Sequence, residues 1–255
     1  MEELESQQKP QLYGPVSAVI WTILIYIAAQ LLAGILISII PLTQGWTTEK
    51  TTGWLTSNVW ATFGFVFIIE AITLGFIYLL LKHRNLKIKT LGLNKPQLKH
   101  VFYALVGFAT YFVIYVIGLI AVKALFPSLN LEQEQEIGFS KSTQGIALIP
   151  VFLSLVILPP ITEEIVARGF LYGGLRTKLP FIVSAIITSV LFAAAHLSGA
   201  KEGLLWVAAV DTFILSLVLC YLREKSGSLW PSIGLHALKN CLAFIVLFDI
   251  VQYIS

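Results

Sequence analysis

The sequence predicts an all-α fold: a polytopic membrane helical bundle of about seven transmembrane spans, with a buried polar cavity in its carboxy-terminal half. Hydrophobic residues make up 57% of the 255 positions, charged residues only 12%, and the mean hydropathy is +0.83. A soluble domain of this length needs a more polar exterior, so the chain is expected to contact lipid. Ionisable residues recur inside the later apolar runs, and these predict the cavity.

Seven apolar runs are long enough, at roughly 20 residues, to cross a bilayer as helices. Three lie in the first half of the chain, and four follow residue 145. The first three contain little that suggests chemistry, whereas ionisable residues interrupt the later ones. The expected spans are residues 16–40, 55–81, 101–126, 146–173, 180–198, 204–222 and 232–252.

The charges of the connecting segments predict the orientation. Segment 82–100 contains six Lys and Arg residues and no acidic residue, whereas segment 127–145 contains three glutamates and one lysine. Because basic loops stay in the cytoplasm, the amino terminus is expected there. The compact chain with short loops favours a bacterial plasma membrane. The small net charge of +3 does not indicate nucleic-acid binding.

The sequence suggests three parts. Residues 1–15 form a cytoplasmic amino-terminal tail, residues 16–126 form three accessory transmembrane helices, and residues 140–255 form the membrane domain that carries the candidate site. The tail lacks the basic start of a signal peptide, so no cleavage is expected. Cys220 and Cys241 lie in apolar runs and are expected to be inert buried thiols.

Six polar residues stand out within the later spans, where each costs free energy and therefore indicates function by default. Glu164 and Arg168 are four residues apart, so on one helix they share a face and can pair. Glu163 points elsewhere and lacks such a partner, which suits a general base. The full set is Glu163, Glu164, Arg168, His196, His236 and Asn240.

The two histidines come from two further spans. His196 ends one apolar run, and His236 lies four residues before Asn240 on one face of the last span. Two histidines and a carboxylate from three helices can bind a metal ion or activate a water molecule directly. Pro159 and Pro160 are expected to kink the acidic helix and free backbone carbonyls, which is tolerated where the backbone lines a cavity.

Three short motifs in this region resemble those of a known family. Glu-Glu-Ile-Val-Ala-Arg-Gly (163–169), Phe-Ala-Ala-Ala-His (192–196) and His-Ala-Leu-Lys-Asn (236–240) look like the EExxxR, FxxxH and HxxxN motifs of the CPBP intramembrane proteases. That family is also called CAAX proteases, bacteriocin-processing enzymes or Abi. Each motif alone arises by chance, but three in order form a strong signal. The resemblance covers about residues 140–250.

The resemblance implies a hydrolase, an endopeptidase that cuts a peptide or protein substrate near a membrane face. Glu163 would activate the water, and His196 and His236 would complete its site. Asn240 would donate a hydrogen bond to the developing oxyanion. The remaining motif residues, Glu164 and Arg168, would be the structural pair that supports Glu163.

Cofactors and partners follow from the same resemblance. A divalent metal such as zinc, held by His196, His236 and Glu163, would make the protein a metalloprotease. The alternative is a water molecule that Glu163 activates without a metal. The residues do not decide between the two mechanisms. Membrane lipid and a peptide or protein substrate are the expected partners. Nucleic acid is not expected, and the oligomeric state stays open.

Two other classes of function stay open. A non-catalytic relative, such as a bacteriocin-immunity or scaffold protein, would keep the polar residues for binding, although apolar residues could replace buried charges there at little cost. A small proton-coupled transporter would use Glu163 as a proton relay, but such proteins typically contain internal repeats with matching broken helices. Only the break at Pro159 and Pro160 is visible here.

Four further features carry expectations of their own. Glu70 and Asp211 lie within spans and are expected to form interhelical hydrogen bonds. Lys239, inside the last motif, is expected to reach the cytoplasmic interface with its long side chain. Residues 197–210 are expected to re-enter the membrane in part, because His196 falls late in its span and His236 early in its own.

Overall fold

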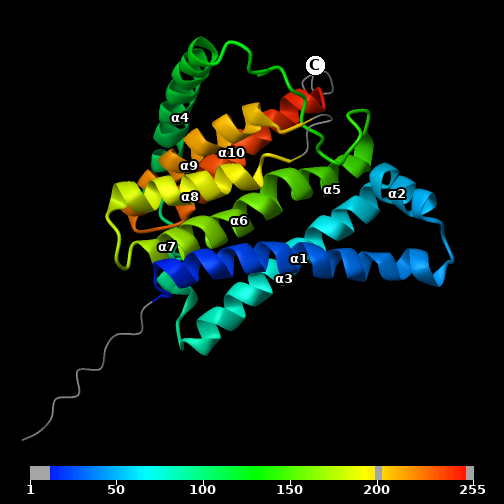
Figure 1. The fold of residues 1–255 in the computed structure, drawn as a ribbon, viewed down its shortest axis with the longest axis horizontal. Helices are drawn as coiled ribbons and strands as arrows, with labels where there is room; N and C mark the ends of the chain where they lie inside the picture. Colours follow the sequence, from blue (N-terminus) through cyan, green and yellow to red (C-terminus); the bar gives the residue numbers. More distant parts are fainter. Residues whose placement is uncertain (1–11, 199–202, 251–255) are drawn as a thin grey trace, which may run out of the picture.

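The computed structural model describes residues 12–198 and 203–250, and the regular secondary structure in these ranges is helical, which confirms the all-α fold (Figure 1). Most helices are long and regular, and one span is built from several short pieces. The elements are α1 Pro15–Thr43, α2 Thr48–Ser57, α3 Val59–His83, η1 Ile88–Leu91, α4 Leu98–Leu125, η2 Gly145–Ala147, α5 Leu148–Phe152, η3 Leu153–Ile157, α6 Leu158–Glu164, η4 Ile165–Leu171, α7 Tyr172–Leu175, α8 Phe181–Ala195, α9 Trp206–Ser226 and α10 Trp230–Leu247.

Six described stretches are long and apolar enough to cross a membrane: α1, α3, α4, the composite stretch Gly145–Leu175, α9 and α10. α8 is also apolar, but it has only 15 residues. At a rise of about 1.5 Å per residue it is about 22 Å long, shorter than the hydrocarbon core of about 30 Å. The predicted polytopic helical membrane bundle is therefore confirmed, with six stretches long enough to span and α8 as a shorter apolar helix.

The second span begins later than the predicted residue 55. The Asn58 side chain accepts hydrogen bonds from the backbone N–H groups of Trp60 and Ala61 and so caps the amino terminus of α3. The Asn58 backbone is extended, with φ −99° and ψ 106°, and separates α3 from α2. The apolar residues before Asn58 therefore belong to a different helix.

The fourth span alternates between α-helical and π-helical turns. η3 and η4 are both π-helical, and they flank α6, the short helix that contains Pro159, Pro160 and the two glutamates. Because a proline has no backbone N–H, the carbonyls one turn before the two prolines lose their usual donors. The helix cannot stay regular there, in agreement with the expected break, and π-helical turns of this kind are frequent at functional sites.

The composite span lies among the other helices. It packs against α1 and α3 on one side and against α8 and α10 on the other. The largest apolar core joins these layers, with Ile25 on α1, Ile77 on α3 and Phe170 on η4 all buried in it. The two glutamates of α6 are therefore held between the amino-terminal and the carboxy-terminal helices.

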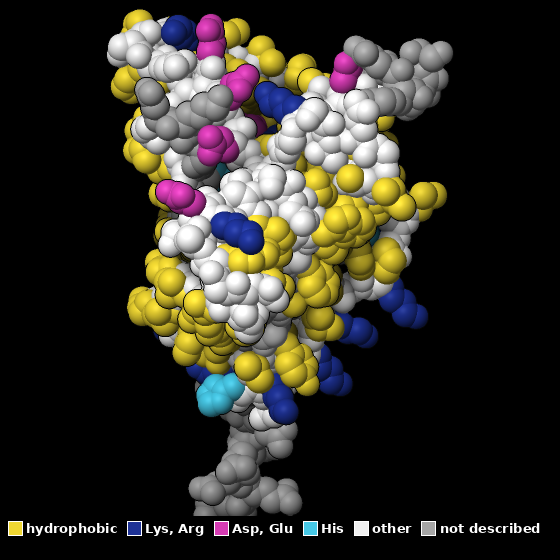
Figure 2. Space-filling view, turned by 90° about the vertical axis from the view of Figure 1, so that its right-hand side faces the viewer, with side chains coloured by type: hydrophobic (Ala, Val, Ile, Leu, Met, Phe, Trp, Pro, Cys, Tyr) yellow, Lys and Arg dark blue, Asp and Glu magenta, His cyan; other side chains and the backbone are white. Residues whose placement is uncertain are grey.

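The charged side chains separate toward two ends of the molecule. Figure 2 shows most Lys and Arg side chains toward the lower end and most Asp and Glu side chains toward the upper end, with hydrophobic surface between them. This distribution is typical of a membrane protein with basic cytoplasmic loops. A cytoplasmic amino terminus stays a prediction.

Two expectations fall partly outside the described residues. The proposed re-entry of residues 197–210 includes residues 199–202, and the described structure resumes at residue 203, with α9 beginning at Trp206. The predicted tail, residues 1–15, includes residues 1–11, and α1 begins at Pro15.

Candidate active site

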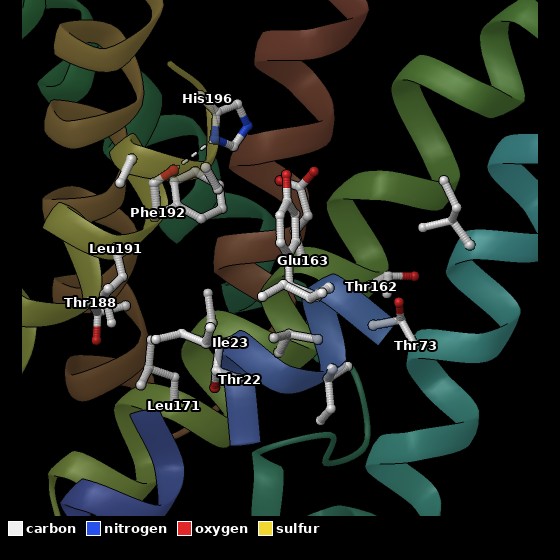
Figure 3. A pocket seen from close by; sticks show the side chains of 18 of the residues that line it. Thr22, Ile23, Thr73, Thr162, Glu163, Leu171, Thr188, Leu191, Phe192 and His196 are labelled. Atoms are coloured by element: carbon white, nitrogen blue, oxygen red, sulfur yellow. Dashed lines mark hydrogen bonds between the residues drawn. The ribbon is translucent and has the colours of Figure 1, made fainter. Parts of the chain in front are cut away.

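A cavity of about 500 Å³ lies between α1, α3, α6, η4 and α8 (Figure 3). Its wall is mainly apolar. The cavity was expected in the carboxy-terminal half, but α1 and α3 supply part of the wall, so the first spans contribute to the site in a way that the sequence did not predict. The polar side chains that line it are Thr22, Glu70, Thr73, Thr162, Glu163, Thr188 and His196.

Glu163 lies near the end of α6 and reaches this cavity (Figure 3). Its side chain is 31% exposed, although its Oε2 atom is buried. Its Oε2 atom has no hydrogen-bond partner among the described residues. His236 Nε2 lies 3.8 Å from Oε2, which is too long for a hydrogen bond. The carboxylate therefore keeps lone pairs with which to bind a water molecule.

Glu164, the next residue, has the opposite environment. Its side chain and that of Arg168 are fully buried, and Arg168 Nη1 lies 2.9 Å from Glu164 Oε1. The same oxygen lies 3.0 Å from His236 Nδ1. A carboxylate paired with arginine accepts hydrogen bonds, so Nδ1 of His236 is the donor and Nε2 faces Glu163. The four-residue spacing predicted the first contact, but no spacing pointed to the second.

The ring of Phe192 packs against both histidines and the arginine. The Arg168 guanidinium carbon lies 4.3 Å from the centroid of the Phe192 ring. The ring centroids of His196 and His236 lie 4.7 Å and 6.0 Å from the same ring. The two histidines therefore meet around one side chain, although they come from the end of α8 and the early turns of α10.

His196 is oriented by the turn that precedes it. Its Nδ1 atom lies 2.7 Å from the Phe192 carbonyl oxygen, a contact drawn in Figure 3. A carbonyl only accepts, so Nδ1 donates and the neutral ring keeps its lone pair on Nε2. His196 lines the cavity with Glu163. The site thus has an imidazole nitrogen that can exchange a proton.

Asn240 is directed at the broken helix. Its Nδ2 atom donates a hydrogen bond of 2.9 Å to the backbone carbonyl of Leu155 in η3. The donor to that carbonyl would be residue 159 in an α-helix and residue 160 in a π-helix, and both are proline. Asn240 supplies the missing donor. The second N–H of its amide is left for another acceptor.

The candidate residues are thus partly brought together. Glu163 and His196 share the cavity, and His236 approaches Glu163 from α10. A metal centre fits these positions less well, because in residues 12–198 and 203–250 no three His, Cys, Asp or Glu side chains are grouped so that they could hold an ion. The Nδ1 atoms of His236 and His196 are engaged with Glu164 and with the Phe192 carbonyl, so their Nε2 atoms are the nitrogens that remain available as ligands. The zinc site stays a prediction.

A second polar cluster lies where α4, α9 and α10 meet. Lys239 Nζ forms an ion pair of 2.6 Å with Asp211 Oδ2, and the Tyr111 hydroxyl donates to the other oxygen of Asp211. The expected interhelical hydrogen bond of Asp211 is therefore confirmed. The Lys239 ammonium group thus has an acidic partner on the neighbouring helix, and its reach to the cytoplasmic interface stays a prediction.

Comparison with known proteins gives a consistent picture. Residues 145–242 match the model of a family described as "Type II CAAX prenyl endopeptidase Rce1-like". The Staphylococcus aureus "Membrane-embedded CAAX protease MroQ" is 26% identical over 243 residues, which are 91% of this chain and 88% of that protein. No solved structure matches.

Two further relatives match over shorter regions. An uncharacterised 24.3 kDa protein of Escherichia coli is 33% identical over 100 residues, which are 38% of this chain and 44% of that protein. The Bacillus subtilis protein YdiL is 29% identical over 109 residues, 43% of this chain and 41% of that protein. The chain thus spans less than half the length of these two. The family resemblance seen in the three motifs is confirmed, since residues 145–242 match the Rce1-like family model of type II CAAX prenyl endopeptidases.

Proposed function

We propose that the protein is an intramembrane-type endopeptidase that hydrolyses a peptide bond of a membrane-associated substrate with a water activated by Glu163. One observation carries this proposal. Two adjacent glutamates have separate environments: Glu164 is fully buried between Arg168 and His236, whereas the Glu163 side chain is 31% exposed and lines a cavity. This division of roles suits one structural and one reactive carboxylate.

The first chemical step in this proposal is proton transfer from water to Glu163. A water placed beside Glu163 Oε2 and His236 Nε2, which are 3.8 Å apart, can reach both at ordinary hydrogen-bond distances. Glu163 takes one proton while the water oxygen attacks the peptide carbonyl carbon. His236 holds the water through its Nε2 lone pair, because its Nδ1 proton is directed to Glu164.

The second step breaks the carbon–nitrogen bond. The tetrahedral intermediate collapses, and the proton held by Glu163 passes to the leaving amine, so that one water is consumed for each bond cut. Negative charge on the carbonyl oxygen needs a donor. The second N–H of Asn240 and a protonated His196 are the groups that we assign to it.

The surroundings of the cavity support a substrate that comes from the membrane. Ile23, Tyr26 and Ile27 of α1 line the cavity and are also exposed at the protein surface, where lipid would lie. An apolar substrate segment would therefore meet the cavity wall without crossing water. A cytoplasmic amino terminus is supported by the charge separation of Figure 2. A bacterial plasma membrane is supported by the bacterial relatives.

Purified protein in liposomes, incubated with a library of membrane-associated peptides, tests this function. We expect wild-type protein to cut at least one peptide, and Glu163→Gln to abolish that cleavage. Glu136→Gln makes the same charge change at an exposed loop position and should leave cleavage unchanged. Unaltered cleavage by Glu163→Gln would contradict the proposal, and a wild-type protein that cuts nothing would favour a non-catalytic scaffold.

A further inference from the structure

Glu70 is a second carboxylate in the cavity, and the proposed reaction does not use it. It comes from α3, three residues before Thr73, so the two share one face of that helix. Figure 3 shows Glu163 with Leu191 and Phe192 of α8 on one side and Thr73 of α3 on the other. Glu70 therefore belongs to the part of the cavity wall that α3 supplies.

The charges around the cavity are unbalanced. The wall contains two carboxylates, Glu70 and Glu163, and none of the described residues that line it is Lys or Arg. Arg168 is close in sequence, but it is fully buried against Glu164 and does not line the cavity. Within the described chain no Lys, Arg or His forms an ion pair with Glu70.

A carboxylate without a cation is costly inside a membrane protein, and such groups commonly mark binding sites. A cavity with low-dielectric walls and one sign of charge also concentrates ligands of the opposite sign. Other polar groups are available beside it: the hydroxyl oxygens of Thr22 and Thr188 have no hydrogen-bond partner in the part of the chain that the structure describes. Thr188 is completely buried and lines the same cavity.

The cavity has a larger volume than one catalytic water molecule requires. About 500 Å³ falls within the range of pockets that bind small organic ligands, and it can hold several side chains of an extended peptide. The wall is apolar except at the few positions named above. It can therefore bury the alkyl part of a long side chain while a carboxylate meets its charged end.

We infer that Glu70 forms a specificity subsite for a cationic side chain, lysine or arginine, of the peptide substrate. The inference rests on the proposed peptidase function and adds the chemistry of one substrate residue to it. Glu163 acts on the peptide bond, whereas Glu70 holds a side chain at a fixed distance from that bond. The subsite therefore selects where along a membrane-associated peptide the cut is made.

The test uses the full-length protein in liposomes and a peptide that the wild type cuts. Each position around the cut is changed in turn to lysine, glutamine and glutamate, and kcat/KM is measured. We expect one position at which lysine is preferred to glutamine by at least about tenfold, the range of a charge-assisted hydrogen bond. Glu70→Gln should remove this preference, and Glu70→Lys should transfer it to glutamate. Glu136→Gln is the matched control and should keep it.

The outcomes separate the two proposals. Cleavage that disappears in Glu163→Gln but shows no lysine preference, or a preference that Glu70→Gln leaves intact, overturns the subsite and leaves the peptidase standing. A wild-type protein that cuts no peptide overturns the peptidase proposal itself, and cleavage that survives Glu163→Gln overturns the assignment of Glu163 as the base. If Glu70→Gln does not fold, the wild-type series still decides, because equal rates for lysine and glutamine at every position overturn the subsite.

Discussion

The side-chain amide of Asn240 donates a 2.9 Å hydrogen bond to the backbone carbonyl of Leu155, and this contact ties α10 to the helix that carries the two glutamates. The carbonyl needs this donor because residues 159 and 160 are both proline. The helix break at the two prolines thus sets the position of α10 along α6, through the hydrogen bond from Asn240. His236, one turn before Asn240, is thereby set between Glu163 and Glu164.

This relationship predicts a coupling between Asn240 and Pro159. Asn240→Ala leaves the Leu155 carbonyl without a donor and should lower the free energy of unfolding by about 1–3 kcal/mol. Pro159→Ala restores the backbone N–H at residue 159, so in that background Asn240→Ala should cost less, with a coupling of about 1 kcal/mol. Unfolding in detergent micelles measures all four forms.

Pro41→Ala provides the control background for this cycle, because Pro41 lies inside the distant helix α1. Asn240→Ala should keep its full cost there. Equal costs of Asn240→Ala in the Pro159→Ala and Pro41→Ala backgrounds would show that the amide does not replace the missing helical donor.

A second prediction concerns the buried pair. Replacing Glu164 or Arg168 alone by glutamine leaves a fully buried charge without its partner, which should cost about 3–5 kcal/mol of stability. Replacing both should recover part of that loss. If the double variant is destabilised by the full sum of the single variants, the ion pair is not the stabilising element.

The cluster around Asp211 gives a third prediction. Asp211→Asn weakens the ion pair with Lys239 and the hydrogen bond from Tyr111, so it should lower stability by about 1–3 kcal/mol. Tyr111→Phe should cost less in the Asp211→Asn background than in the wild type. Lys225→Met removes an exposed cation at the end of α9 and serves as the control. Additive effects of Asp211→Asn and Tyr111→Phe would argue against a coupled cluster.

The predicted orientation can be tested with reporters fused to the two ends of the chain. The basic loops predict a cytoplasmic amino terminus, and seven crossings would then put the carboxy terminus outside. α8 is the span at issue, because it is shorter than a typical hydrocarbon core. A reporter after Ser255 that reads as cytoplasmic would mean that α8 does not complete a crossing.

Much of the fold followed from apolar run length, because lipid imposes a simple requirement on each span. The helix boundaries did not follow from it. α3 begins where the Asn58 side chain caps it, and a hydropathy profile does not detect such a capping contact. In the site, the four-residue spacing anticipated the contact between Glu164 and Arg168. The contact between Glu164 and His236 joins residues 72 positions apart, so no local pattern could predict it.

The role of the amino-terminal spans was missed for a related reason. Glu70 is an ionisable residue within a predicted span, but nothing near it in the sequence connects it with the carboxy-terminal motifs. Only the packing of α3 against α6 brings it into the cavity. The signal in the sequence for a contribution of α3 to the cavity was a single acidic residue in an apolar run, far from any motif.

The most direct test of the account compares the two neighbouring glutamates in one experiment that measures both kcat for a cleaved peptide and the unfolding midpoint. Glu163→Gln should lower kcat at least about 100-fold, the range of lost general-base catalysis, with the midpoint nearly unchanged, because Glu163 Oε2 has no hydrogen-bond partner in the described structure. Glu164→Gln should lower the midpoint strongly. A Glu163→Gln protein that keeps its kcat within a few-fold of wild type would contradict the assignment of Glu163 as the base.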